Sequence, residues 1–516
     1  MSIHCAGSNS HGQLGVGDEN DRHRWTRAKV VAAPVRARPS AIACGANHTL
    51  WIDQLSGRVL AAGGNQRGQL GARNAADTSA TVFSHVDIAK LIDQAGVREL
   101  ATDRYTVQGV AAAWETSFFV LRPLDPARSD VVLSTGANDW GERGCPGADP
   151  RAATRIEFEN LLQPEARRGP LRIVRLQAGP RHVVALIHVG ELIDTDGPDV
   201  AGTSSSSSSP CRRLLVGWGA SRQGQLGCAD LQPSSPPPRV TPSPQPVVLP
   251  APYQPTDVCS FSLGKDHTAF LVRDRNQGGP DAAGTVAVLL GSDKHGQLSV
   301  SRHGEVVEPP SGVPRRPAES LKSQRSNLLR VEDLLDENEH DPASRWRLVG
   351  VHCTWSSTFC HLEHLATSSE HRSATATTTG SRIVGFGHNS HGQLGAKPIA
   401  RPGGAASAPP RSSSLELSHR VTQLSCGSEH VLALLETGEI MGWGWNEHGN
   451  LAAQAAAPAS ERDTARHTED NTLADVWQPR RIWPPDGRST EEAGKATRIA
   501  AGNATSWILT PDLSPL

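Results

Sequence analysis

The stretch GSNSHGQLG at residues 7–15 returns six more times along this chain, and this repetition decides the fold. A phrase that recurs in this way indicates a fold assembled from copies of one small unit. Residues shared by the copies serve the unit, so functional residues are expected where the copies differ. The other copies are GGNQRGQLG (63–71), GANDWGERG (136–144), GASRQGQLG (219–227), GSDKHGQLS (291–299), GHNSHGQLG (387–395) and GWNEHGNLA (444–452).

A second phrase alternates with the first and consists of an apolar strand, a tight turn and another apolar strand. Aliphatic and β-branched runs bounded by glycine are typical of strands. We name these two strands A and B; strand C runs into the glycine phrase, and strand D follows it. The copies are AIACGANHTLWI (41–52), VAAAWETSFFVL (110–121), RLQAGPRHVVAL (175–186), CSFSLGKDHTAFLV (259–272), VGVHCTWSSTFCHL (349–362), TQLSCGSEHVLALL (422–435) and RIAAGNATSWIL (498–509).

Seven units of about four strands predict an all-β, seven-bladed β-propeller, because radial repetition leaves only short sheet edges. The chain enters its first glycine phrase through a C strand at residues 3–6, with no A and B strands before it. The last A–B pair, at 498–509, has no C strand after it. We expect these halves to complete one blade and to close the ring by sheet pairing, giving a single domain over 1–516.

Six stretches between the repeats are predicted to be long, disordered loop insertions. They are rich in Ser, Pro, Thr and Ala or in charges, and such compositions bury too little apolar surface to order themselves. Residues 320–340, with leucines among charges, could form a short helix. The predicted insertions are 199–210, 231–256, 299–345, 364–381, 398–418 and 452–479.

Composition limits the class of protein and its location. The net charge of −2 over 516 residues gives no global attraction to nucleic acid. No apolar run is long enough to span a membrane, and residues 1–6 lead directly into the first repeat instead of a signal peptide. The nine cysteines include no CxxC pair, which favours a reducing compartment, in the cytoplasm or also the nucleus.

The sequence predicts neither an enzyme nor a cofactor. The repeated glycines fit turns between strands and lack the Lys-Ser/Thr of a phosphate loop. No nucleophile has a base partner that a motif identifies. The group His352, Cys353, Cys360 and His361 has the residue types of a zinc site, but its cysteines fall at buried strand positions, so no metal is predicted.

Histidine recurs at the start of strand B. His48, His182, His267 and His430 occupy the position that Thr116, Ser357 and Thr505 fill in other copies. A metal site would not tolerate that variation. These side chains are predicted to hydrogen-bond the backbone of the turns near the channel.

The alternation of GxNxxGQLG with turns such as CGANHT resembles the regulator of chromosome condensation repeat, which forms seven-bladed propellers. In such a propeller the seven A–B turns gather at one mouth of the central channel. Here these turns carry tryptophans and mixed charges, the usual chemistry of an interface. The predicted partner-binding residues are Asn47, Trp114, Glu115, Arg181, Asp266, Trp355, Glu429 and Asn503, with Trp140 and Trp445 as secondary candidates. Trp51, Trp218, Trp443 and Trp507 lie in strands and are assigned to the core.

Three roles within this family compete. Nucleotide exchange on the small GTPase Ran uses acidic and histidine residues in the A–B turns, which Asp266 in GKDHT (264–268) matches, but those members carry a basic N-terminal tail. Ultraviolet sensing uses GWRHT turns, whereas neither Trp114 nor Trp355 precedes an arginine. Members similar to the fungal alpha-tubulin suppressor begin with a glycine phrase and an acidic stretch, as CAGSNSHGQLGVGDEND (5–21) does here.

The third resemblance implies a non-catalytic scaffold. Its partner would be a small zinc-binding protein of the diphthamide pathway, bound as a heterodimer. The role implied is support of diphthamide synthesis and of Elongator-dependent modification of the tRNA wobble uridine. Exchange on Ran, or another protein-interaction role, remains the alternative. Direct binding to nucleic acid or to membranes is not expected.

Overall fold

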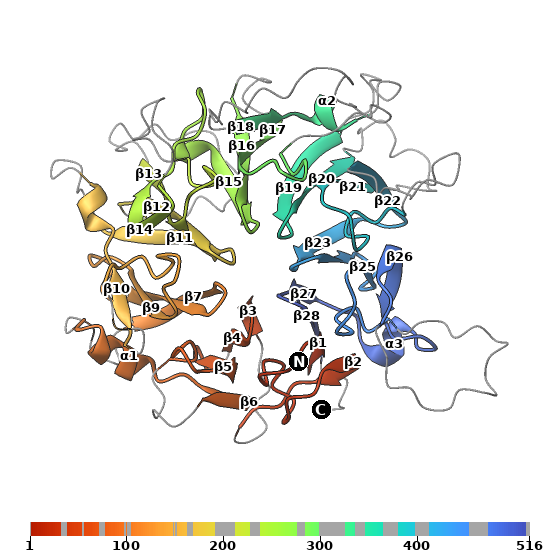
Figure 1. Ribbon diagram of the computed structural model, residues 1–516, viewed down its shortest axis with the longest axis horizontal. Coiled ribbons are helices and arrows are strands. Elements are labelled where there is room, and N and C mark those ends of the chain that lie inside the picture. Colours follow the sequence, from red (N-terminus) through yellow and green to blue (C-terminus); the bar gives the residue numbers. More distant parts are fainter. Residues whose placement is uncertain are drawn as a thin grey trace, which may run out of the picture.

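The computed structural model describes residues 2–31, 39–53, 56–71, 78–97, 100, 105–147, 149, 152–162, 169–190, 212–227, 238–275, 284–298, 326–335, 346–364, 380–397, 412–453 and 473–511. Within them, seven four-stranded antiparallel sheets stand radially around one axis (Figure 1). The predicted all-β, seven-bladed propeller is confirmed, with A, B, C and D strands in the expected order from the axis outward.

We number the blades along the chain, with the blade shared by the termini as blade 7. Blade 1 is β3 (Pro39–Cys44), β4 (His48–Asp53), β5 (Val59–Gly64) and β6 (Ser79–His85); blade 2 is β7 (Tyr105–Ala112), β8 (Thr116–Pro123), β9 (Val131–Gly136) and β10 (Thr154–Ile156); blade 3 is β11 (Leu171–Ala178), β12 (His182–Val189), β13 (Arg212–Ala220) and β14 (Val240–Pro246); blade 4 is β15 (Val258–Leu263), β16 (His267–Asp274), β17 (Gly284–Gly291) and β18 (Ser326–Leu329). Blade 5 is β19 (Trp346–Cys353), β20 (Ser357–His364), β21 (Ser381–Gly387) and β22 (Ser412–Leu417); blade 6 is β23 (Val421–Cys426), β24 (His430–Leu435), β25 (Ile440–Gly444) and β26 (Val476–Trp483); blade 7 is β27 (Arg498–Ala501), β28 (Thr505–Thr510), β1 (Ser2–Gly7) and β2 (Arg22–Arg27). Short helices α1 (Ile88–Gln94), α2 (Val331–Leu334) and α3 (Thr490–Ala493) lie between strands.

The predicted closure of the ring is confirmed. Strand β1 lies between β28 and β2, and its register with β28 runs from Ser2 opposite Thr510 to Gly7 opposite Thr505. The two ends of the chain therefore share one sheet (Figure 1). Ile3 and Cys5 are buried in the core that blade 7 shares with blade 1.

Several of the predicted insertion ranges include residues that form regular secondary structure. Strand β14 lies within 231–256, β18 and α2 within 299–345, β22 within 398–418, and β26 begins within 452–479. These are outer strands with one sheet neighbour, so they need few apolar residues and tolerate proline, as in β14 with Pro242 and Pro244. The helix suggested within 320–340 is the single turn α2, preceded by a strand. Residues 199–210, and 364–381 apart from its ends, lie outside the described residues.

Four tryptophans predicted to be core are buried, and two of them tie neighbouring blades together. Trp218 in blade 3 donates its indole N–H to the carbonyl of Glu142, 2.6 Å away in blade 2. Trp443 in blade 6 donates to the carbonyl of Gln393, 2.9 Å away in blade 5. Each acceptor belongs to a glycine phrase, so the repeated phrase of one blade supports the next blade.

Three of the four repeat histidines, His48, His182 and His430, also join neighbouring blades, which corrects their predicted role. His48 Nε2 lies 2.9 Å from Ser117 Oγ in blade 2, and that hydroxyl donates to the carbonyl of Gln69 in blade 1. His182 contacts Thr268, and His430 contacts Ser506, in the same way. Burial lowers the pKa of His48 to about 3, so its ring is neutral. The sequence predicted hydrogen bonds to the local turn because the partner hydroxyl belongs to another blade, and the sequence does not show that this blade lies alongside.

Candidate functional site

The seven A–B turns form a rim at one mouth of the channel, and hydrogen bonds between neighbouring turns join them in two runs, one of three turns and one of four. Each of five described contacts joins an amide of one turn to a carbonyl of the next. Since the turns support one another, side chains on the rim are held on a preorganised base. The bonds run from Ala46 to Trp114 (2.7 Å), Trp114 to Pro180 (3.1 Å), Lys265 to Trp355 (3.0 Å), Trp355 to Ser428 (2.8 Å) and Ser428 to Gly502 (3.2 Å).

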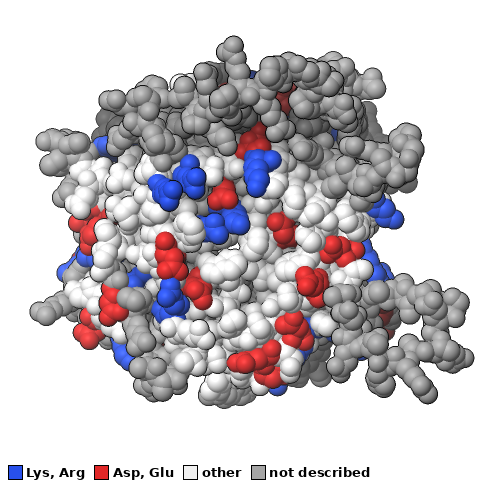
Figure 2. All heavy atoms as spheres, in the orientation of Figure 1, with Lys and Arg blue, Asp and Glu red and all other residues white. Residues whose placement is uncertain are grey.

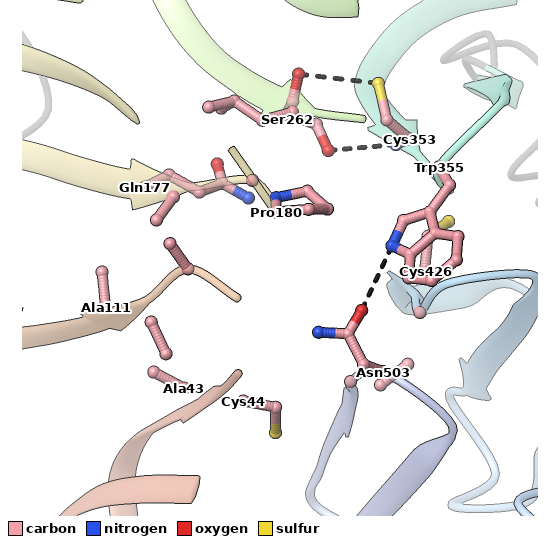
Figure 3. A pocket seen from close by; sticks show the side chains of 18 of the residues that line it. Ala43, Cys44, Ala111, Gln177, Pro180, Ser262, Cys353, Trp355, Cys426 and Asn503 are labelled. Carbon is pink, nitrogen blue, oxygen red and sulfur yellow. Dashed lines mark hydrogen bonds between the residues drawn. The ribbon is translucent and has the colours of Figure 1, made fainter. Parts of the chain in front are cut away.

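Two predicted site residues, Trp114 and Trp355, meet across this mouth. They come from blades 2 and 5, and their ring centroids are 5.6 Å apart at a 42° tilt. Trp355 donates its indole N–H to Asn503 Oδ1 at 3.1 Å (Figure 3). The Lys265 ammonium lies 5.8 Å from the Trp355 ring centre. Trp114 remains 42 % exposed, although nothing in the blade requires an aromatic side chain there.

A cavity of about 220 Å³ adjoins the mouth, and Trp355 forms part of its lining. Inner strands of the blades line it, with small residues such as Ala43 and Ala111, and with Cys44, Cys353 and Cys426 (Figure 3). Burial raises the pKa of Cys44 and of Cys353 to about 12, so these thiols are protonated at neutral pH. The described lining of this cavity is therefore uncharged.

The remaining predicted residues form smaller groups around the rim. Asn47 donates to Glu115 Oε1 at 2.8 Å, and Arg181 lies 4.5 Å from the ring centre of Trp140. Asp266 is half-buried beside Lys265. The structure thus brings Trp114, Trp355 and Asn503 together, pairs Asn47 with Glu115, and pairs Arg181 with Trp140.

Glu429 is the rim carboxylate with the most altered acidity. Burial raises its pKa to about 7, against the opposing effects of a 2.7 Å hydrogen bond from Gln393 Nε2 and of Lys265. A carboxyl group that titrates near neutral pH at a channel mouth is a candidate for a binding role. Its charge would respond to any cation that a partner brings.

Trp445 belongs to a separate group, in the glycine phrase that follows β25 of blade 6. Its ring centre lies 6.2 Å from that of His391 and 5.2 Å from that of His448. His391 Nδ1 lies 3.0 Å from Asp475 Oδ2, and His448 Nδ1 lies 2.7 Å from Asp21 Oδ2. Sequence reasoning missed both histidines, although His occupies the fifth position of four glycine phrases.

The His448–Asp21 pair joins blade 6 to the closing blade and predicts a pH dependence. The hydrogen bond with Asp21 raises the pKa of His448. Burial would raise the pKa of Asp21, but hydrogen bonds from His448 and the Asn9 amide lower it overall. Stabilisation by His448 is complete below its unfolded pKa of 6.5 and is lost as the pH rises through the raised folded value. Stabilisation by Asp21 is present above 3.8 and is lost as the pH falls through the lowered folded value.

We therefore expect His448→Asn to lower the melting temperature most between pH 3.8 and 6.5, and to have little effect in alkaline buffer. Both side chains are about a third exposed, so the loss should stay below about 1 kcal/mol. Melting curves across this pH range, with the exposed His85→Asn as control, test the expectation. An equal loss at every pH would contradict it.

Charge on the face shown in Figure 2 is mixed. Lys and Arg side chains are interspersed with Asp and Glu around a mostly uncharged surface near the centre. Within the described ranges, no group of three or more His, Cys, Asp or Glu side chains is placed to hold a metal ion. No helix in the described part of the chain is long and apolar enough to cross a membrane.

Comparisons with known proteins agree with this architecture. The regulator of chromosome condensation (RCC1) repeat matches residues 2–52, 382–434 and 421–450. The bovine secretion-regulating guanine nucleotide exchange factor is 24 % identical over 92 % of this chain and 77 % of its own length, and the mouse protein is 24 % identical over 92 % and 76 %.

Solved structures show the same fold. Prp20p from Saccharomyces cerevisiae superposes with a TM-score of 0.61 at 17 % identity, over 99 % of this chain and 92 % of that one. Human WBSCR16 does so with a TM-score of 0.58 at 16 % identity, over 99 % and 100 %. Fold and repeats together define a closed, seven-bladed repeat propeller. Over residues 2–52 and 382–450 the chain carries repeats of the regulator of chromosome condensation family.

Proposed function

We propose that this protein is a non-catalytic propeller that binds a small partner protein at the channel mouth. The observation that carries the proposal is the Trp114–Trp355 pair, placed across the mouth from blades 2 and 5. Large aromatic side chains with partial exposure are typical anchors of protein interfaces. The rim around them supplies Lys265, Asn503 and Glu429 as polar contacts.

Two partner classes are proposed. The first is a small zinc-binding protein of the diphthamide pathway, supported by the resemblance of residues 5–21 to alpha-tubulin suppressor-like members. In this role the protein would support diphthamide synthesis and Elongator-dependent wobble-uridine modification, in the cytoplasm and also the nucleus. Both partner classes would bind the same channel-mouth surface.

The second class is a small GTPase, with the propeller promoting guanine-nucleotide exchange. It is supported by similarity to the secretion-regulating guanine nucleotide exchange factors over 92 % of the chain. Prp20p, which shares the fold, is described with binding properties to Gsp1p and histones. The acidic residues Asp266 and Glu429 on the rim are of the kind that the family resemblance implies for exchange.

Partner capture tests the shared surface. Trp114→Ala and Trp355→Ala should each weaken binding of the captured partner at least about tenfold, since a buried aromatic anchor accounts for about 2 kcal/mol or more. Leu124→Ala is the matched control, because Leu124 is 63 % exposed and follows β8 at the end away from the mouth. Normal binding by both tryptophan variants, or an equal loss with Leu124→Ala, would refute the surface.

Two further measurements separate the partner classes. A zinc-protein partner predicts that a deletion strain loses diphthamide on elongation factor 2 or side chains of the tRNA wobble uridine. A GTPase partner predicts that purified protein accelerates GDP release from Ran or a related GTPase, and that Trp355→Ala reduces this acceleration. If neither result is obtained, both partner assignments are wrong. The mouth surface is then tested only by the partner-capture experiment.

A further inference from the structure

A second cavity, of about 440 Å³, opens along the channel between the inner strands of blades 3 to 6. It shares Gln177 and Ser262 with the lining of the first cavity. Its other residues, among them Arg175, Ser260 and Gly350, precede these along strands that run toward the mouth, so this cavity lies farther from the rim. The volume is within the usual range for small-molecule sites.

The charges that line this cavity are unbalanced. Two cations, Arg175 and Arg420, line it with a single carboxylate, Glu363. The other two basic side chains, His352 and His361, are neutral, because burial lowers their pKa to about 3 and about 4. Glu363 is already engaged, because Arg420 Nε donates to its Oε1 at 3.0 Å. Arg175 is thus left as the cation of this cavity without a carboxylate partner among the described residues.

The contacts of Arg175 orient it without neutralising it. Its guanidinium lies 5.2 Å from the ring centre of Phe261, and it donates to the Phe261 carbonyl at 3.3 Å and to Gln177 Oε1 at 3.4 Å. Desolvation lowers the pKa of this guanidinium, although the side chain as a whole is exposed. A cation stacked on a ring, with most of its five N–H donors uncommitted, is well suited to a bidentate oxyanion.

Neutral donors line the same cavity. Ser262 Oγ accepts the Cys353 amide at 3.0 Å, which leaves its hydroxyl proton for another acceptor. Burial lowers the pKa of His352 to about 3, so its neutral ring offers one N–H. A Cβ at position 350 would lie 2.9 Å from His352 Nε2, so Gly350 keeps space beside that ring.

We propose that this cavity binds a small anion that presents phosphate or carboxylate oxygens to Arg175. The guanidinium supplies the charge and a fork of two N–H groups, while Ser262 and His352 supply neutral hydrogen bonds. The site is distinct from the mouth, because none of its cationic residues belongs to an A–B turn. Such an anion would lie against the inner strands of four blades.

Isothermal titration calorimetry at fixed ionic strength tests this site, with inorganic phosphate and citrate as separate probes. At least one probe should bind the wild-type protein, and Arg175→Gln should weaken that binding at least about tenfold. Arg347→Gln is the matched control, because Arg347 is an exposed arginine of β19 outside the cavity lining, and it should bind as wild type. Binding of phosphate alone identifies a phosphate ligand, and binding of citrate alone identifies a carboxylate ligand.

The proposal is overturned if neither probe binds at about 10 mM, a concentration that would reveal even millimolar affinity. It is also overturned if Arg175→Gln binds as tightly as wild type. Melting curves without probe show whether Arg175→Gln is folded. If it is not, Arg175→Lys should keep the charge, lose the fork and bind more weakly than wild type; unchanged binding by this variant contradicts the role of the guanidinium.

Discussion

Deleting residues 1–10 is expected to abolish cooperative folding of the whole ring. This deletion removes β1, which pairs on one side with β28 and on the other with β2. Both neighbours lose their ladders, and buried Ile3 and Cys5 leave the core beside blade 1. An opened sheet edge favours aggregation. The loss should match the whole stability of an ordinary domain, about 5–15 kcal/mol.

The measurement is the soluble yield of the truncated protein together with its thermal transition. A peptide of residues 1–16 added in trans should pair with β28 and restore a cooperative transition, whereas a scrambled peptide should not. A truncated protein that melts like the full chain would contradict closure by strand pairing.

Most of this fold could be predicted from the repeats, because the strands and turns of each blade are encoded by its own stretch of sequence. Strands B and C are mostly buried on both faces, and together with the glycines beside them they keep a recognisable pattern in all seven copies. Outer strands such as β14 and β22 left little trace, since one sheet neighbour and a solvent-facing side demand few apolar residues. The predicted insertions therefore extended over these outer strands.

The site was predictable in part. The repeat identified which turns carry unusual residues, and Trp114 and Trp355 do lie at the mouth. It could not show that blades 2 and 5 bring them into contact, because pairing across a ring depends on three-dimensional closure. Arg175 was also missed; its signal is that Gly109 and Gly350 occupy the same place in strand A of other blades.

Gly63→Ala is expected to be among the most destabilising single substitutions in the chain. Gly63 opens a glycine phrase with φ of +114°, and a Cβ there would lie 2.3 Å from the carbonyl oxygen of Asn47. That same carbonyl accepts the amide of Gly64 at 2.8 Å, so the clash also breaks the bond between phrase and turn. Backbone strain and the lost contact together should cost about 3 kcal/mol or more.

Gly57→Ala is the matched control for this effect. Gly57 lies in the same blade with φ of +66°, and a Cβ there would meet nothing within 4 Å. Alanine at such a position costs about 1–2 kcal/mol through its backbone conformation alone. Chemical denaturation of both variants should therefore place Gly63→Ala well below Gly57→Ala in free energy of unfolding, and equal losses would show that the contact with Asn47 is unimportant.

Gly63→Ala should also disturb the channel mouth, because Asn47 is a rim residue whose side chain donates to Glu115. All seven glycine phrases begin with a glycine at positive φ, and in each a Cβ would lie 2.1–2.6 Å from the carbonyl of a mouth turn. The repeated glycine is thus the contact through which each blade positions its part of the rim. At a temperature where Gly63→Ala remains folded, partner capture should be weaker than for Gly57→Ala; equal capture would separate the rim from the glycine phrases that support it.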